Sequence, residues 1–449
     1  MRPFVILSCA LATAIAPAHA QNFIQAIALA RNAEPGYLGA KANLAATLEK
    51  ANQAYADLLP QLSASVATHD THRNYLTRDD PFPPSVDRYN NNTAQINLTQ
   101  PLWRHSTLIA KTQADLAASQ AEFQLMTSEQ ELLARLVGAW VDCMLARDVS
   151  LFAERQVAAT REQWEVMKRG AQLGIATIPA REETHAKYEQ ALSDQVSAQM
   201  DSQARAAALE QLIGPLTSFD PPFLASPFQG PDLAQDSLER WLESADRTSP
   251  SIHAASRALD AASEEIRKQS AGHEPTLDLV GSYNHNGQSV GNFPGQNGYD
   301  IRQGAVGLQL NIPIYSGGGQ AAKVREAAAM REKARQDLEA ARRAVRLAIK
   351  QAWFGWQTGR ARQRTAEHAI DAATLARDSA SVGKSSGLNI DLDLLQAEQQ
   401  LAGARRDLNK ARYEMIAAIF KLKATAGVLS DADIALLASN FAGQEPAAP

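Results

Sequence analysis

The feature that most constrains the fold of this 449-residue chain is an internal duplication, because two distant parts of it carry the same motifs. The corresponding motifs are Leu59-Pro60-Gln61-Leu62 and Glu274-Pro275-Thr276-Leu277, Asn97 to Trp103 and Gln309 to Tyr315, Gly174-Ile175 and Gly387-Leu388, and Ile213-Gly214 and Ala426-Gly427. The offset between the two copies is nearly constant along the chain and amounts to almost half its length. Such a period is too long for a solenoid of small repeats, so the sequence predicts two structural halves.

Residues 1–20 are typical of a secretory signal peptide. Arg2 supplies the positive charge, Phe4 to Ile15 form a mostly apolar run, and Ala18-His19-Ala20 matches a small-residue cleavage site. A lipoprotein signal at Cys9 is the alternative, but Cys9 lies too early to leave a full apolar segment before it. We therefore predict an exported protein.

The predicted mature chain begins at Gln21 and keeps one cysteine, Cys143, which excludes an internal disulfide. No later stretch has the ~18 apolar residues of a membrane helix. Such a chain is either soluble outside the inner membrane or a β-barrel protein of an outer membrane. The formal net charge is −5, and nucleic acid is not an expected partner because it would call for a basic face.

Four short segments alternate apolar and polar residues, which is the pattern of a strand with two different faces. They are expected at about 61–70, 93–103, 276–286 and 304–315, and the stretches 70–93 and 286–303 between them are expected as polar loops. A half-buried sheet of a soluble protein alternates in the same way. Aromatic side chains near the strand ends, as at a membrane interface, favour outer-membrane strands; they are Trp103, Tyr283, Tyr299 and Tyr315.

Long helical hairpins are expected after each pair of strands. The outgoing helices are predicted at Thr107 to about Arg169 and Gln320 to about Ser381, and the returning helices at Pro179 to Ile213 and Ile390 to Ala426. About sixty residues of helix span roughly 90 Å, so these helices need partners along their length. An earlier helical segment, 22–57, is expected to be interrupted near Pro35.

The predicted organisation follows from these elements. It comprises a signal peptide at 1–20, a first repeat at 21–214, a proline-rich linker or equatorial segment at 215–235, a second repeat at 236–428, and a C-terminal equatorial segment with a flexible tail at 429–449. Four membrane strands cannot close a barrel, because the smallest single-chain barrels use about eight and an open sheet edge in lipid leaves backbone groups unpaired. Several chains would therefore share one barrel. Two chains would supply eight strands, whose interior side chains fill, and three would supply twelve, wide enough for a lumen; closed cyclic symmetry fits either number.

In these motifs the chain resembles the TolC-type outer membrane channel-tunnel family. The segments that carry the resemblance are Leu59-Pro60-Gln61-Leu62, Leu98-Thr99-Gln100-Pro101-Leu102, Pro275-Thr276-Leu277-Asp278-Leu279, Val306-Gly307-Leu308, Ile312-Pro313-Ile314-Tyr315-Ser316-Gly317-Gly318 and Ala411-Arg412-Tyr413. The resemblance implies a mixed α and β fold: a homotrimer with one twelve-stranded β-barrel and a periplasmic α-barrel of long antiparallel coiled-coil helices.

The resemblance also implies a function. A member of the family is the passive exit duct of a type I secretion or multidrug efflux system in the outer membrane of a Gram-negative bacterium, in contact with its lipid. It works with a periplasmic adaptor (membrane fusion) protein and an inner-membrane pump of the ABC or RND type, and needs no cofactor. The cargo is not encoded in such a duct. A soluble periplasmic coiled-coil scaffold or adaptor is the alternative from a different class.

Candidate gate residues lie at the start of the last long helix. By the resemblance, Asp393 corresponds to the first aspartate of a ring that selects cations at the closed periplasmic tip, and Gln396 stands at the second ring position. Asp391 is a candidate substitute for that second acid. An acid here also complements the helix dipole behind Asn389, a natural cap, so a purely structural role stays open.

The polar links that close the tip in the family fall on residues of mixed character here. The matching positions are Pro179, Ala180, Lys384 and Asn389, and the nearby charged residues are Arg181, Glu182 and Glu183. Pro179 and Ala180 cannot form side-chain hydrogen bonds, so we expect a different network, with ion pairs from the nearby charged residues.

No arrangement of residues points to an enzyme. His69 and His72 flank Asp70, but two histidines are too few for a structural metal site. Gly383-Lys384-Ser385 resembles the end of a phosphate-binding loop, yet Asp378 stands where the first glycine belongs. The sequence therefore predicts no catalytic, cofactor or metal site.

Overall fold

A computed structural model describes most of the chain, namely residues 23–75, 85–215, 221–224, 233, 237–291, 297–385 and 391–442. The predicted signal peptide and Asn389 lie outside these residues. The helices are α1 (Phe23–Ala33), α2 (Pro35–Ala56), α3 (His105–Gln172), α4 (Ile178–Ile213), α5 (Leu238–Thr248), α6 (Pro250–Ser270), α7 (Gly319–Ser385), α8 (Asp391–Ala426) and α9 (Asp431–Ser439), with a 3₁₀ turn η1 (Ala271–His273). The strands are β1 (Gln61–Tyr75), β2 (Ser85–Trp103), β3 (Phe223–Leu224), β4 (Thr276–Gln288), β5 (Tyr299–Asn311) and β6 (Phe441–Ala442).

The predicted order of elements is confirmed. Two strands, a long helix and a returning helix follow one another in β1, β2, α3 and α4, and again in β4, β5, α7 and α8. The early helical segment breaks at Glu34, and Pro35 begins α2, where its missing N–H costs no helical hydrogen bond. Within the described ranges, no helix is both long and apolar enough to cross a membrane.

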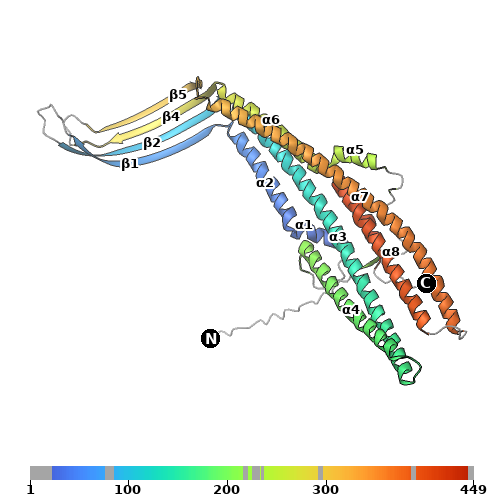
Figure 1. The fold of residues 1–449 in the computed structure, drawn as a ribbon. Coiled ribbons are helices and arrows are strands. Elements are labelled where there is room, and N and C mark those ends of the chain that lie inside the picture. The colour runs from blue at the N-terminus through green and yellow to red at the C-terminus, as the bar shows by residue number, and fades with distance from the viewer. Residues whose placement is uncertain are drawn as a thin grey trace, which may run out of the picture. The chain divides into compact units, whose positions relative to one another are not determined.

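The four long strands form one antiparallel sheet in the order β1-β2-β4-β5, seen side by side in Figure 1. The pairing of β2 with β4 joins the strand pair of the first half to that of the second. The register of the two pairs is equivalent, since Leu62 lies opposite Leu98 and Leu277 lies opposite Leu310. The duplication read from the sequence is therefore also present in the hydrogen-bonded ladder.

The strands differ from the prediction at their ends. β1 and β2 continue to Tyr75 and Ser85, well into the stretch expected as a loop, because polar side chains pair across the ladder as well as apolar ones do. Arg88 contacts Asp70 at 2.7 Å in this extension. β4 and β5 likewise extend, to Gln288 and back to Tyr299. β5 ends at Asn311, although the alternation predicted a strand as far as 315.

The chain divides into two compact units. One unit comprises residues 40–125 and 250–343 and contains the four-stranded sheet, and the other comprises residues up to 39, 126–249 and from 344 onward. α3 and α7 contribute residues to both units. α3 has 68 residues, about 100 Å at ~1.5 Å per residue, close to the predicted length.

The unit without the four-stranded sheet has its core around one apolar stripe of α3. Leu132, Leu136, Trp140 and Met144 recur at four-residue spacing, so they face the same side of the helix, and all are almost fully buried. The ring of Phe23 in α1 meets Trp140 edge to face at 5.1 Å. Burial of each large apolar side chain contributes about 1.5–3 kcal/mol, which makes this cluster the main packing contribution to the unit.

A buried polar cluster links α3 to α8 within the same unit. Asp148 accepts hydrogen bonds from Arg147 at 2.6 Å, Asn409 at 2.9 Å and the hydroxyl of Tyr413 at 3.0 Å. Burial and the neighbouring Asp148 raise the pKa of Tyr413, so its phenol stays a neutral donor. The guanidinium of Arg147 also lies over the ring of Phe223 in β3, which pairs with β6 in a small sheet. This sheet occupies the segments expected as equatorial.

We predict that Cys143, the one cysteine of the predicted mature chain, is chemically inert in the folded protein. It is 3% exposed, and burial raises the pKa of its thiol to about 12, so about one thiol in 10⁴ is ionised at pH 8. A maleimide should leave the folded protein unlabelled at pH 7.5 and label it fully in guanidinium. The exposed Leu173→Cys variant should react at once as a control. Full labelling of the folded wild-type chain would contradict this account of the core.

Candidate functional site

The two faces of the four-stranded sheet have opposite chemistry. In register, one face carries Leu62, Ala64 and Val66 from β1, Ile96 and Leu98 from β2, Gly281 and Tyr283 from β4, and Val306, Leu308 and Leu310 from β5. The other face carries Ser63, Ser65, Gln95, Asn97, Ser282, Asn284, Gln303 and Gln309. The apolar side chains are open to the surroundings, with exposed fractions of 85% at Val66 and 82% at Val306.

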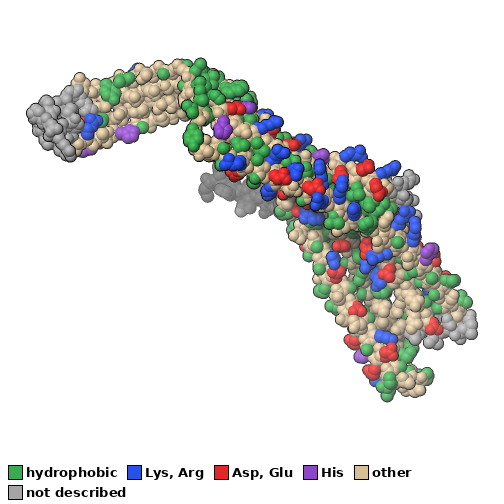
Figure 2. All heavy atoms as spheres, turned by 45° about the horizontal axis from the view of Figure 1, so that its top comes forward, with side chains coloured by type: hydrophobic (Ala, Val, Ile, Leu, Met, Phe, Trp, Pro, Cys, Tyr) green, Lys and Arg blue, Asp and Glu red, His purple; other side chains and the backbone are tan. Residues whose placement is uncertain are grey.

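This apolar face crosses all four strands in the rows of Leu62 and Ala64, and toward the loops it ends at His285 and Arg302. Figure 2 shows few charged side chains over the strands away from their loop ends, and many over the helices. A contiguous exposed apolar face of this kind is unusual for a soluble protein and marks contact with a membrane or a partner. The polar face behind it is what the lumen of an outer-membrane barrel requires.

Both edges of the sheet lack a strand partner within the described chain. β1 is the first strand and β5 the last, and every residue of β5 is exposed. Backbone donors and acceptors along such an edge cost several kcal/mol each in lipid unless another strand pairs with them. The sheet is therefore incomplete as a membrane structure.

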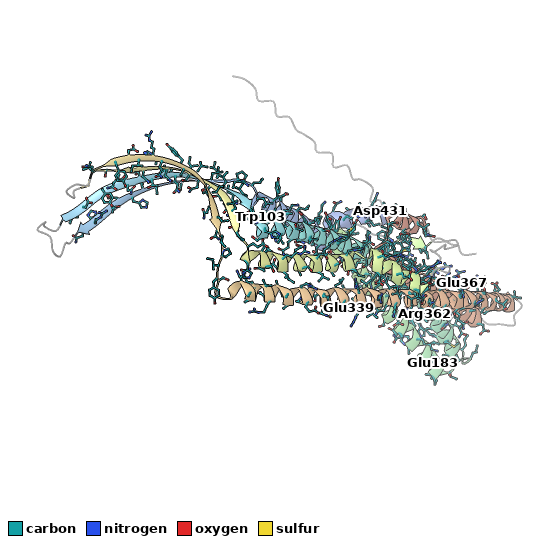
Figure 3. All side chains as sticks on the ribbon, turned by 90° about the horizontal axis from the view of Figure 1, so that it is seen from above. Trp103, Glu183, Glu339, Arg362, Glu367 and Asp431 are labelled. Atoms are coloured by element: carbon teal, nitrogen blue, oxygen red, sulfur yellow. The ribbon has the colours of Figure 1, made fainter. Side chains whose placement is uncertain are left out.

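Polar side-chain contacts connect the two halves where β2 ends and α3 begins. Trp103 ends β2 (Figure 3), and the next residue, Arg104, donates two hydrogen bonds to Asp278 in β4, at 2.8 and 2.6 Å. His105 lies 2.8 Å from a carboxylate oxygen of Glu274. Because the Asp278 side chain is only 10% exposed, its ion pair with Arg104 compensates for the loss of water around the carboxylate. These contacts were not predicted from the sequence. The features that could have indicated them are an arginine directly after one strand, Arg104, and an aspartate inside another, Asp278.

The turn between α3 and α4 lies between the two helices predicted from the sequence, which were expected to end at about Arg169 and to begin at Pro179. Gly174 has a φ of 72°, which only glycine adopts without strain, and the N–H of Ile175 bonds back to the carbonyl of Gly170 at 2.8 Å. Thr177 caps α4 by accepting a hydrogen bond from the N–H of Ala180. Leu173 and Ile175 are exposed at this turn. Sequence reasoning missed these apolar side chains.

The charged residues predicted to link the tip form ion pairs inside α4. Arg181 contacts Glu182, its neighbour in the chain, and Glu183 contacts Lys187 at 2.7 Å. Lys187 lowers the pKa of Glu183 through this hydrogen bond. Figure 3 marks Glu183 on α4. The structure brings these side chains together with helix neighbours, whereas links between helical hairpins stay a prediction.

Aromatic stacking joins α3 and α4 near their turn. The ring of Trp164 lies parallel to that of Tyr188 at 5.5 Å and also contacts His185 at 4.8 Å. Lys168 sits over the Trp164 ring at 4.7 Å. These contacts hold the two antiparallel helices together close to their ends, a role that the sequence pattern did not reveal.

The candidate gate residues lie at the beginning of α8. Asp393 is the third residue of the helix and is exposed, and Gln396 is exposed one turn later on the same side. Asp391 begins the helix and Lys384 lies near the end of α7, but their side chains are outside the described residues. Arg362 of α7, labelled in Figure 3, contacts Glu414 of α8 at 2.6 Å, so the second hairpin also has a cross-link between its helices.

No grouping of three or more His, Cys, Asp or Glu that could hold a metal occurs among the described side chains. Asp70, which the sequence places between two histidines, is paired with Arg88.

Comparisons with known proteins agree with this geometry. The family described as "Outer membrane efflux protein" matches residues 26–215 and 241–428. Outer membrane protein TolC of Vibrio cholerae is 27% identical over 434 residues, covering 96% of each chain. Alkaline protease secretion protein AprF of Pseudomonas aeruginosa is 29% identical and covers 86% of each chain.

A solved structure has the same fold. The outer membrane protein VceC from Vibrio cholerae superposes with a TM-score of 0.72 at 18% identity, over 90% of this chain and 96% of that one. The family match covers most of the chain, in two ranges that each contain one strand pair and one helical hairpin. The chain therefore belongs to the outer membrane efflux protein family, whose members are exit ducts of the Gram-negative outer membrane.

Proposed function

We propose that three copies of this chain form the exit duct of a tripartite export system. The observation that carries the proposal is the four-stranded sheet with an apolar outer face and two open edges. Three such sheets supply twelve strands, enough to enclose a lumen, and cyclic symmetry pairs every open edge. The polar faces then line the passage, and the apolar faces contact lipid.

The repeats would have the same role within one copy. The predicted boundaries at 21–214 and 236–428 lie near the two ranges of the family match, which supports two equivalent halves. Each half would contribute two strands to the barrel and one hairpin to a periplasmic tunnel of twelve helices. The segments 215–235 and 429–449 would form an equatorial part around the tunnel, where β3 pairs with β6.

The partners would be a periplasmic adaptor protein and an inner-membrane pump of the ABC or RND type. The sequence has no complete phosphate-binding loop, so the pump would supply the energy and the duct would be passive and non-enzymatic. AprF is named for alkaline protease secretion, so a secreted protein is one candidate cargo, and the pump rather than the duct would select it.

The gate would lie at the periplasmic tip, where α8 begins. Three copies would place three Asp393 carboxylates around the passage, and a ring of like charges attracts cations. Gln396 would replace a second acid, so this ring would carry fewer charges than one with two acids per copy. Asp391 is a further candidate for the ring, and Asn389, Lys384, Arg181, Glu182 and Glu183 are candidates for its closing links.

The membrane assignment of the sheet predicts that its polar face tolerates a charged substitution and that its apolar face does not. Leu308→Arg should reduce the amount of protein in the outer membrane strongly, because an arginine near the bilayer midplane costs about 2–4 kcal/mol. The neighbouring Gln309→Arg should insert normally, since position 309 faces the polar side. Immunoblots of purified outer membranes measure both. Equal loss in the two variants would contradict the orientation of the sheet.

The proposed gate predicts opposite effects of two substitutions. In planar bilayers the wild-type duct should prefer cations and be blocked by multivalent cations at the tip. Asp393→Asn should weaken the preference and the block, whereas Gln396→Asp should strengthen both by completing the second ring. Unchanged selectivity in both variants would leave Asp393 with a structural role at the helix N-terminus and place the gate elsewhere.

A further inference from the structure

The duplication relates the strands of the two halves residue by residue. The shared motifs relate Leu62 to Leu277 and Leu98 to Leu310. In the sheet, Leu62 lies opposite Leu98 and Leu277 lies opposite Leu310. β4 is thus the equivalent of β1, and β5 the equivalent of β2, with no slip in either ladder.

The joint between the halves provides a template for a joint between copies. Within the chain, the last strand of the first half, β2, pairs with the first strand of the second half, β4. In the proposed trimer, the last strand of the second half, β5, meets the first strand of the first half, β1, of the next copy. Because the two halves are duplicates, the strand edges that meet at the two joints are equivalent, and the register of the internal joint is the template for the joint between copies.

We propose that β5 pairs with β1 of a second copy in the register of the β2–β4 joint, so that Gln309 lies opposite Ala67. This inference rests on the proposed trimer and assigns its seam. It follows from the internal pair of Asn97 and Ser282, whose equivalents are Gln309 and Ala67. In the same register Leu310 lies opposite Val66, on the apolar face.

The end of β5 supports its pairing with a second copy. In the first half, Gln100 to Trp103 belong to β2, and their partners are in β4. The equivalent residues after Asn311 are not in a strand, and Ile314 and Tyr315 are 93% and 88% exposed, against 51% and 53% for Leu102 and Trp103. The proposed register gives this apolar segment the missing strand. The internal joint has a bulge between Pro101 and Trp103, and with the equivalent bulge Tyr315 lies opposite Leu62 of the second copy, as Trp103 lies opposite Leu277.

The alternation of apolar and polar residues along β5 and β1 limits the number of alternative registers. A shift by one residue would turn the polar face of one strand toward lipid, so only shifts by two residues compete. Matching of apolar side chains alone favours one such shift, in which Leu308 lies opposite Val66 and Gln309 lies opposite Ser65. The repeat and simple apolar matching therefore predict different partners for Gln309.

The test is disulfide formation between paired cysteines in outer membranes, read on non-reducing gels. In Ala67→Cys with Gln309→Cys, oxidation should link copies covalently. Ser65→Cys with Gln309→Cys, and His69→Cys with Gln309→Cys, should give about tenfold less linked product, because diagonal neighbours lie ~7–8 Å apart and exceed the reach of a disulfide. The buried Cys143 can stay in place.

A matched internal pair controls for folding and oxidation. Asn97→Cys with Ser282→Cys should form its bond within one chain, without linking copies. If that bond forms and the Ser65 pair links copies best, the register is wrong but the shared duct stands. If it forms and no pair links copies, the register is wrong, and the number of chains in the membrane-inserted particle decides whether the trimer fails with it. Failure of the internal bond in membrane-inserted protein would remove the template and overturn the proposal.

Discussion

Pairing of backbone hydrogen bonds in lipid is the constraint on which the rest of this molecule depends. One chain supplies a sheet of four strands whose outer face is apolar and whose edges are open. Lipid solvates the side chains of such a sheet but not the N–H and C=O groups along its edges. In the proposed duct, further copies of the chain supply the missing strands, and a long helical hairpin follows each pair of strands.

The two kinds of joint in such a ring would differ in strength. Inside the chain, Arg104 forms an ion pair with Asp278, and His105 lies within hydrogen-bond distance of Glu274. Side-chain contacts therefore hold the halves together as well as the ladder does. The repeat places small or uncharged residues at the equivalent positions of the joint between copies, namely Ser316, Ser63, Gly317 and Leu59. The seam between copies would thus rely on backbone pairing and apolar contact, and copies would separate there first.

Sequence reasoning predicted what depends on local pattern. Alternation around Leu62 and the turn at Gly174 gave the strands and hairpins in the right order. It did not predict the extension of β1 to Tyr75, because a run of polar residues has no apolar alternation that would distinguish a strand from a loop. It also missed the contacts of Asp278 and Asp148, since these pair residues 174 and 265 positions apart and depend on a register that no local pattern contains.

The central claim is that three copies share one barrel, and the number of chains in the membrane-inserted particle tests it most directly. Native mass spectrometry of protein released from outer-membrane vesicles counts those chains without prior detergent extraction. The account predicts a single species of three chains, since three sheets pair all open edges and enclose a lumen. A membrane-inserted particle of one chain would contradict it.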